Sequence, residues 1–156
     1  MRAKKGFTLV EILIVVVILG ILAAIVIPQF TDASTEAKTS SLCSDLQTVR
    51  SQIELYKIQH NDNLPDMEIA ADDGDNDLTR ITNVSGTEVA AGTANSFGPY
   101  LQKMPKNAFN NSTTVVIVDT AGADPNASVG TGENGWYFNS VTGAFHAIDS
   151  DEHSGL

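Results

Sequence analysis

The sequence of 156 residues holds a single cysteine, Cys43, which excludes an intramolecular disulfide and the Cys-x-x-Cys-His attachment site of a c-type haem. No Cys-x-x-Cys or His-Glu-x-x-His pattern occurs, and the three histidines are scattered at 60, 146 and 153, so no zinc motif is present. The domain must therefore be held by packing or by a metal. There is also no nucleophile elbow and no Gly-rich phosphate loop, which disfavours an enzyme and an organic cofactor.

Basic residues are scarce. Nine Lys and Arg stand against nineteen Asp and Glu, giving a net charge of −10. Three of the nine, Arg2, Lys4 and Lys5, precede residue 7, so a chain without them would keep six basic residues and carry about −13. Such a surface repels phosphate backbones, and no basic patch interleaved with aromatics offsets it. We expect no nucleic-acid partner.

One long apolar run dominates the N-terminal region. Residues 7–27 are apolar except for Thr8 and Glu11. As a helix, these twenty-one residues would be roughly 31 Å long, which matches the hydrocarbon core of a bilayer. The basic residues lie on its N-terminal side, so the positive-inside rule places residues 1–6 in the cytoplasm and the chain after Pro28 outside.

Two alternatives compete for this run. A secretory signal peptide would have a shorter apolar region ending at a small-x-small site, but Ala23-Ala24 is followed by three more apolar residues. A plain membrane anchor would tolerate Glu11 near the boundary but gives no reason for it. An ionisable residue inside a spanning helix points to a function, here neutralisation by a cation of another subunit.

Residues 5–16, Lys-Gly-Phe-Thr-Leu-Val-Glu-Ile-Leu-Ile-Val-Val, resemble the class III signal of type IV prepilins and type II secretion pseudopilins. This resemblance implies that prepilin peptidase cuts after Gly6 and that the new amino group of Phe7 is N-methylated. It also implies that Glu11 pairs with the amino terminus of a neighbouring subunit. Pro28 matches the position where the long helix of the family bends or locally melts.

The helix is expected to continue after Pro28 as an amphipathic segment over 29–60. Its apolar stripe has spacings of four, three, four and three residues and consists of Leu42, Leu46, Val49, Ile53 and Tyr56. The pattern ends near His60–Pro65. The stripe is too short for a coiled coil, so we expect it to pack against a small sheet.

Residues 61–112 form a long connector rich in Asp, Asn, Gly and Thr. Within it, 96–105 is expected to be a short helical or turn element anchored by apolar residues. Val115–Val118 is predicted as a strand, and 135–138 and 144–148 are predicted as a hairpin around a turn at Ser140–Gly143. The predicted fold class is α+β and pilin-like. A long helix, with a transmembrane half and an amphipathic half, packs on a small antiparallel sheet.

The order of helix, connector and hairpin also resembles the major secretion pseudopilin. Many type IVa pilins close their C-terminal loop with a disulfide, which this chain cannot form. The expected organisation is a cytoplasmic leader (1–6), a transmembrane assembly helix (7–28), an amphipathic helix (29–60) and a periplasmic headgroup (61–156).

Two acidic clusters suggest a calcium site. Residues 72–77 alternate oxygen ligands, but Leu78 stands where an EF-hand needs Gly and Val84 where it needs Glu, so a solvated acidic loop is favoured. Major pseudopilins bind calcium in a C-terminal loop. By location, Asp149 and Asp151 are the candidate ligands, with Asp119 and Asp124 as alternatives.

The sequence thus predicts a structural filament subunit of a type II secretion pseudopilus. A type IV pilin for adhesion or motility is the alternative within the same machinery. The expected partners are further copies of the chain, prepilin peptidase, an inner-membrane assembly platform with its ATPase, and minor pseudopilins or pilins. The expected location is the inner membrane, and after assembly a periplasmic pseudopilus or extracellular pilus. The alternative from another class is a membrane-anchored periplasmic protein that binds calcium or a cationic ligand.

Overall fold

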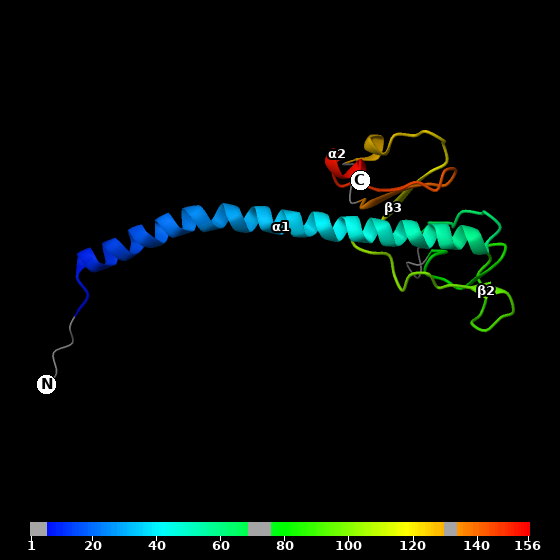
Figure 1. The fold of residues 1–156 in the computed structure, drawn as a ribbon, viewed down its shortest axis with the longest axis horizontal. Coiled ribbons are helices and arrows are strands. Elements are labelled where there is room, and N and C mark those ends of the chain that lie inside the picture. Colours follow the sequence, from blue (N-terminus) through cyan, green and yellow to red (C-terminus); the bar gives the residue numbers. More distant parts are fainter. Residues whose placement is uncertain (1–5, 69–75, 130–133) are drawn as a thin grey trace. The chain divides into compact units, whose positions relative to one another are not determined.

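The computed structural model describes residues 6–68, 76–129 and 134–156. It divides into two compact units, Met1–Lys38 and Thr39–Leu156, which we treat separately. The 51-residue helix α1, Leu9–Gln59, contributes to both (Figure 1). The elements after it are β1 (Thr82–Asn83), β2 (Ser96–Phe97), β3 (Val115–Val118), η1 (Pro125–Ser128), β4 (Trp136–Asn139), β5 (Phe145–Ala147) and α2 (Asp151–Ser154). The predicted α+β fold class is confirmed.

In the first unit, α1 is helical throughout and carries Pro28 in its interior. A proline inside a helix has no N–H to donate to the carbonyl four residues earlier, here that of Ala24. The helix nevertheless continues through Pro28, as expected from the sequence. Pro28 instead leaves one turn with a missing hydrogen bond.

In the second unit, α1 buries the predicted apolar stripe. All five of its residues are buried, namely Leu42, Leu46, Val49, Ile53 and Tyr56. The helix ends at Gln59, after which Asn61 and Asp62 take positive φ angles of 54° and 64°. Short polar residues tolerate this left-handed conformation, and it stops the helix where the periodic pattern stops.

The C-terminal sheet has three strands in the order β3-β4-β5. Strands β4 and β5 pair antiparallel, with Tyr137 opposite His146, and so form the predicted hairpin. Strand β3 occupies its predicted residues but pairs parallel with β4, with Val115 opposite Trp136, so this sheet is mixed. The purely antiparallel sheet is the separate β1-β2 pair, with two residues per strand. Its strand β2 lies at the start of the segment 96–105, which was expected to be a helical or turn element.

The β4-β5 turn contains Gly143, which has a φ of 77°. A Cβ at this position would also come within 2.8 Å of the Leu64 side chain. The turn therefore requires glycine both for its backbone conformation and for the close approach of the connector.

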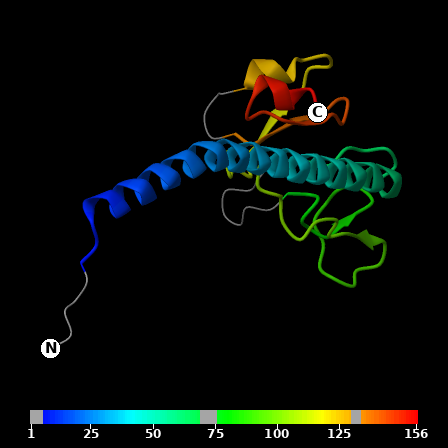
Figure 2. The same ribbon diagram turned by 60° about the vertical axis from the view of Figure 1, so that its left-hand side comes forward.

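One core joins the stripe of α1 to the sheet. The largest fully buried side chains around the stripe are Trp136, Phe138 and Phe145, with Met67 and Leu78 from the connector. Within the second unit, the C-terminal elements lie on one side of α1 and the β1-β2 region lies on the other, as both views show (Figures 1 and 2). Burying this apolar surface is the main force that fixes the unit.

Side-chain contacts hold the C-terminal elements and the connector to α1. Arg50 donates from Nε and Nη2 to the Phe145 carbonyl at 2.9 and 2.7 Å, and from Nη1 to the Leu156 carbonyl at 2.8 Å. On the connector side, the His60 ring stacks on Tyr56 with centroids 3.7 Å apart. The Tyr56 hydroxyl donates to the Asp77 carboxylate at 2.9 Å.

Candidate functional site

The first candidate site is the N-terminal segment around Phe7 and the apolar face that follows it. Every large apolar side chain from Phe7 to Ile27 is exposed, and Phe7 itself is 80% exposed. Among the residues that the structure describes, α1 is the one helix long and apolar enough to cross a membrane. An uncovered apolar surface of this extent is typical of a segment that lies in lipid or against other subunits.

Glu11 lies in the first turn of α1 and caps the N-terminus of this helix together with Thr8. Its Oε2 accepts from the Thr8 backbone N–H at 2.7 Å and from the Thr8 hydroxyl at 2.8 Å. The Glu11 N–H donates back to the Thr8 Oγ1 at 3.3 Å. This reciprocal arrangement is a capping box, which supplies partners for N–H groups that a helix start leaves unsatisfied.

The sequence analysis missed this role of Thr8, although a Thr-x-x-Glu spacing before an apolar run is the recognised signature of a capping box. The consequence for Glu11 is that one oxygen is already engaged within the chain. Its Oε1 has no hydrogen-bond partner among residues 6–68, 76–129 and 134–156. The carboxylate therefore keeps the capacity to accept from a second donor.

The predicted processing residues, Gly6 and Phe7, lie before the first helical residue, Leu9, and both are exposed. A Cβ added at Gly6 would have nothing within 4 Å. An exposed, non-helical peptide bond is accessible to a protease active site. The leader residues 1–5 lie outside the described residues, and the roles of Gly6, Phe7, Glu11 and Pro28 in processing and assembly stay predictions.

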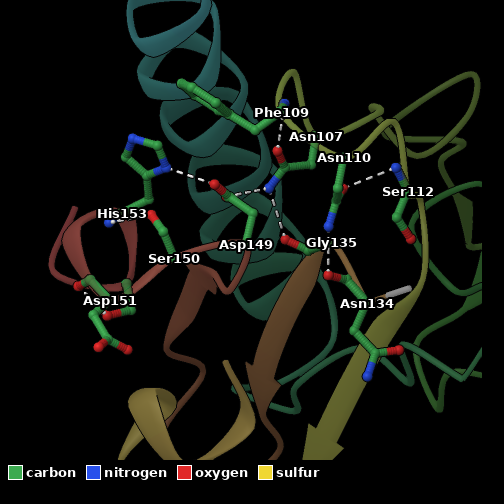
Figure 3. Close-up of polar contacts among 11 residues, drawn as sticks. Asn107, Phe109, Asn110, Ser112, Asn134, Gly135, Asp149, Ser150, Asp151 and His153 are labelled. Carbon is green, nitrogen blue, oxygen red and sulfur yellow. Dashed lines mark hydrogen bonds and ion pairs between the residues drawn. The ribbon is translucent and has the colours of Figure 1, made fainter. Parts of the chain in front are cut away.

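The second candidate site is the polar cluster around Asp149, which follows β5 (Figure 3). Asp149 Oδ2 lies 2.6 Å from His153 Nδ1, and Asp149 Oδ1 accepts from Asn107 Nδ2 at 2.6 Å. A carboxylate only accepts, so His153 Nδ1 carries the proton in this contact. The side chains of Asp149 and His153 are 5% and 10% exposed, which makes this a largely buried ion-pair geometry.

The other predicted calcium ligands do not join this cluster. Figure 3 shows Asp151, in the first turn of α2, pointing away from Asp149. Asp119 is exposed and accepts from the Thr120 hydroxyl at 3.4 Å, and Asp124 accepts from the Asn126 N–H at 2.9 Å and caps η1. No group of three or more His, Cys, Asp or Glu that could hold a metal occurs in the described part of the chain.

The fit to calcium is therefore poor at these positions. Calcium takes six to eight oxygen ligands, whereas the groups that face Asp149 are N–H donors. The acidic loop before Asn76 lies outside the described residues. The expectation of a calcium ion stays a prediction.

His60, Tyr56 and Tyr100 contribute to the packing of the core. His60 is fully buried, with Nε2 at 2.8 Å from the Thr82 hydroxyl. Burial, followed by the hydrogen bond to Asp77, raises the pKa of Tyr56, and burial raises the pKa of Tyr100 to about 12. The hydroxyls of Tyr56 and Tyr100 therefore stay protonated near neutral pH and donate hydrogen bonds to Asp77 and Gln59.

The family model and the relatives named here match the N-terminal part of the chain. The family described as "Prokaryotic N-terminal methylation motif" matches residues 1–27. Type II secretion system core protein G of Pseudomonas aeruginosa is 42% identical over 59 residues, which are 38% of this chain and 42% of that protein. Core protein G of Dickeya chrysanthemi is 39% identical over 60 residues, which are 38% of this chain and 39% of that protein.

A fimbrial protein of Pseudomonas aeruginosa is 44% identical over 54 residues, which are 35% of each chain. The aligned part thus covers less than half the length of each of these three relatives. No solved structure matches the chain. The resemblance of the N-terminal region to prepilins and pseudopilins is confirmed by these matches.

Proposed function

We propose that this chain is a structural subunit of a filament of the type II secretion pseudopilus or type IV pilus kind. A prepilin peptidase removes residues 1–6, and the mature chain assembles through the helix that starts behind Phe7. The observation that carries the proposal is the wholly exposed apolar segment of α1 with Glu11 as its single charged residue, directly behind Gly6-Phe7. The match of residues 1–27 to the methylation motif supports it.

Polar pairing through Glu11 would set the register in which these apolar helices assemble. The apolar side chains gain little by leaving lipid for other apolar helices, so packing and polar pairing must give the assembly its register. Glu11 would supply that register. While Oε2 keeps its bonds to Thr8, Oε1 would accept from the charged amino group of Phe7 in a neighbouring copy. A buried carboxylate without a partner is costly, so an unpaired register is disfavoured.

The proposed life cycle has two locations. The precursor spans the inner membrane with its leader in the cytoplasm and residues after Pro28 in the periplasm. An assembly platform with its ATPase then extracts it into a filament, together with minor pseudopilins or pilins. The work of the subunit is mechanical and requires no catalytic residue.

The pseudopilus is favoured over an adhesive pilus on two grounds. The type II secretion core proteins G align over slightly more of this chain than the fimbrial protein does. The single cysteine also excludes the disulfide that closes the C-terminal loop of many type IVa pilins. A membrane-anchored binding protein is the alternative from another class, and it would give Glu11 no role beyond the helix cap.

The decisive measurement is the intact mass and N-terminal sequence of the full chain co-expressed with a prepilin peptidase. We expect a chain that begins at Phe7 and is one methyl group heavier than the bare product. A sample without the peptidase, and a Gly6→Leu variant with a bulky residue at the cleavage position, serve as controls and should retain Met1.

A chain that begins at Met1 despite the peptidase, or one cut near Ala24, would overturn the proposal. The first result would favour a permanently anchored binding protein. The second would favour a secreted protein released by a signal peptidase.

A further inference from the structure

The resemblance to major pseudopilins implies a calcium ion in the C-terminal loop. We propose that in this chain the hydrogen-bond cluster centred on Asp149 takes the place of that ion and holds together the C-terminal segments of the Thr39–Leu156 unit. The fold of this unit would then be independent of calcium. The inference concerns the folding of the unit and holds whether or not the chain assembles into filaments.

The first argument is the donor set around Asp149. Both carboxylate oxygens accept short bonds of 2.6 Å, one from the Asn107 amide and one from His153 Nδ1. Charge-assisted hydrogen bonds of this length are among the stronger ones in proteins. A cation at this carboxylate would need oxygen atoms where these two N–H groups lie.

The orientation of the Asn107 amide is fixed by three neighbours. Its Nδ2 donates to Asp149 and also to the Gly135 carbonyl at 3.0 Å, and its Oδ1 accepts from the Phe109 N–H at 2.9 Å. If the amide were turned over, two oxygens would face its oxygen and an N–H would face its NH2 group. Asn107 therefore presents nitrogen, not oxygen, to Asp149.

The second argument is that the cluster already links the chain segments that a metal would link. Asn107 comes from the connector, Gly135 lies just before β4, and Asp149 and His153 follow β5 (Figure 3). The Phe109 ring covers His153 with centroids 4.3 Å apart. A second amide, Asn110 Nδ2, donates to the Asn134 carbonyl at 2.7 Å, so the same loop is held to the start of β4 twice.

The energetic consequence follows from burial. Asn107 is fully buried and the Asp149 side chain is 5% exposed. Removal of one partner would leave the other with unsatisfied polar atoms away from water, which destabilises a fold more than loss of an exposed bond does. The cluster is thus a crosslink of the native state that needs no ion.

The test is thermal unfolding of the full chain in detergent, with added calcium chloride or with EGTA. We expect the same midpoint in both conditions for the unmodified chain. A midpoint that rises with calcium and falls with EGTA would overturn the inference, and this measurement requires no variant to fold.

Two variants test the cluster directly. Asn107→Asp replaces the donor with a second carboxylate beside Asp149, so its midpoint should fall in EGTA and recover in part when calcium is added. The control is Asp151→Ala, which removes a nearby exposed carboxylate outside the cluster and should leave both midpoints unchanged. An Asn107→Asp midpoint equal to that of the unmodified chain in EGTA would also overturn the inference.

Discussion

At the scale of single residues, Glu11 combines two properties that can be separated by substitution. Its Oε2 caps α1 through Thr8, which is a property of the isolated chain. Its charge and its free Oε1 serve a neighbouring subunit in the proposed filament. A glutamine at this position keeps an oxygen that can accept from Thr8 but removes the charge.

We therefore predict that Glu11→Gln leaves the helix and the cleavage after Gly6 intact but abolishes or sharply reduces filament assembly, because a neutral amide cannot neutralise a buried ammonium group. The measurement is the yield of sheared filaments in a host with the native assembly partners, alongside the proportion of processed chain.

Thr8→Val is the matched control, since it removes the hydroxyl from the cap and keeps the Glu11 charge. It should assemble far better than Glu11→Gln. Equal loss of filaments in both variants would mean that capping, not charge pairing, is what assembly requires.

His146 is a second residue whose environment has a measurable consequence. It lies on β5 opposite Tyr137, and its Nδ1 is buried with no hydrogen-bond partner among the described residues. Burial, followed by the nearby charge of Arg50, lowers the pKa of His146 below its ordinary value. The folded unit therefore resists protonating this ring.

The sign of the pH dependence follows. Above the unfolded pKa of about 6.5, His146 is neutral in both states and costs nothing. As the pH falls below that value, His146 is protonated in the unfolded chain but stays neutral in the folded chain. The free energy of unfolding therefore decreases until the pH reaches the lower pKa of the folded state.

We predict that the midpoint of thermal unfolding decreases less for His146→Gln than for the unmodified chain when the buffer is changed from about pH 7.5 to about pH 5.5, the range in which histidine titrates. The comparison is made between the two chains because His60 and His153 are common to both. Identical losses would contradict the assignment to His146.

At the scale of elements, the stability of the Thr39–Leu156 unit depends on the stripe of α1. Leu46 is 1% exposed and belongs to the core that includes Trp136 and Phe145, whereas Ile58 on the same helix is 78% exposed. The two residues have comparable side chains and opposite environments, so they form a matched pair.

Leu46→Ala should lower the free energy of unfolding by about 2–5 kcal/mol, through lost burial and the cavity that remains. Ile58→Ala should change it by no more than about 0.5 kcal/mol, as is usual for exposed positions. Chemical denaturation in detergent measures both. A similar loss in the two variants would show that the stripe is not the face that packs.

Local patterns in the sequence were enough to locate α1, its end near His60, strand β3 and the β4-β5 hairpin. These features depend on periodicity and on turn residues such as Gly143, which act over a few positions. The parallel pairing of β3 with β4 and the short β1-β2 pair could not be found in this way. Strand partners are chosen by packing between distant segments, and two-residue strands carry almost no period.

The same distinction separates the two candidate sites. Gly6, Phe7 and Glu11 form a contiguous motif, so the resemblance could point to them, and the Thr8-Glu11 spacing could have revealed the cap as well. The bonds from Asn107 and His153 to Asp149 cross 42 and 4 residues. In the sequence, only the position of acidic residues after the last strand was visible. Together with the resemblance to major pseudopilins, that position suggested an ion where the fold has N–H donors.

At the scale of the whole molecule, the two units differ in whether their apolar surface is covered by the chain itself. The Thr39–Leu156 unit covers its stripe with its own strands and connector, and Met67 and Leu78 of the connector belong to that core. In the Met1–Lys38 unit, the apolar side chains behind Phe7 are exposed. One unit is complete in itself, and the other has an apolar surface that lipid or further copies of the chain would cover.

The Arg50 bonds to the Phe145 and Leu156 carbonyls have a consequence for biogenesis. Their partners lie 95 and 106 residues further along the chain, so α1 is synthesised long before the groups that hold it. At the usual rate of translation, the interval between Arg50 and Phe145 is roughly 5–20 s. The β4-β5 hairpin, which packs on the buried face of α1, is complete only at the end of that interval. A chaperone or the membrane surface that shields this face during synthesis would decide how much newly made protein escapes proteolysis.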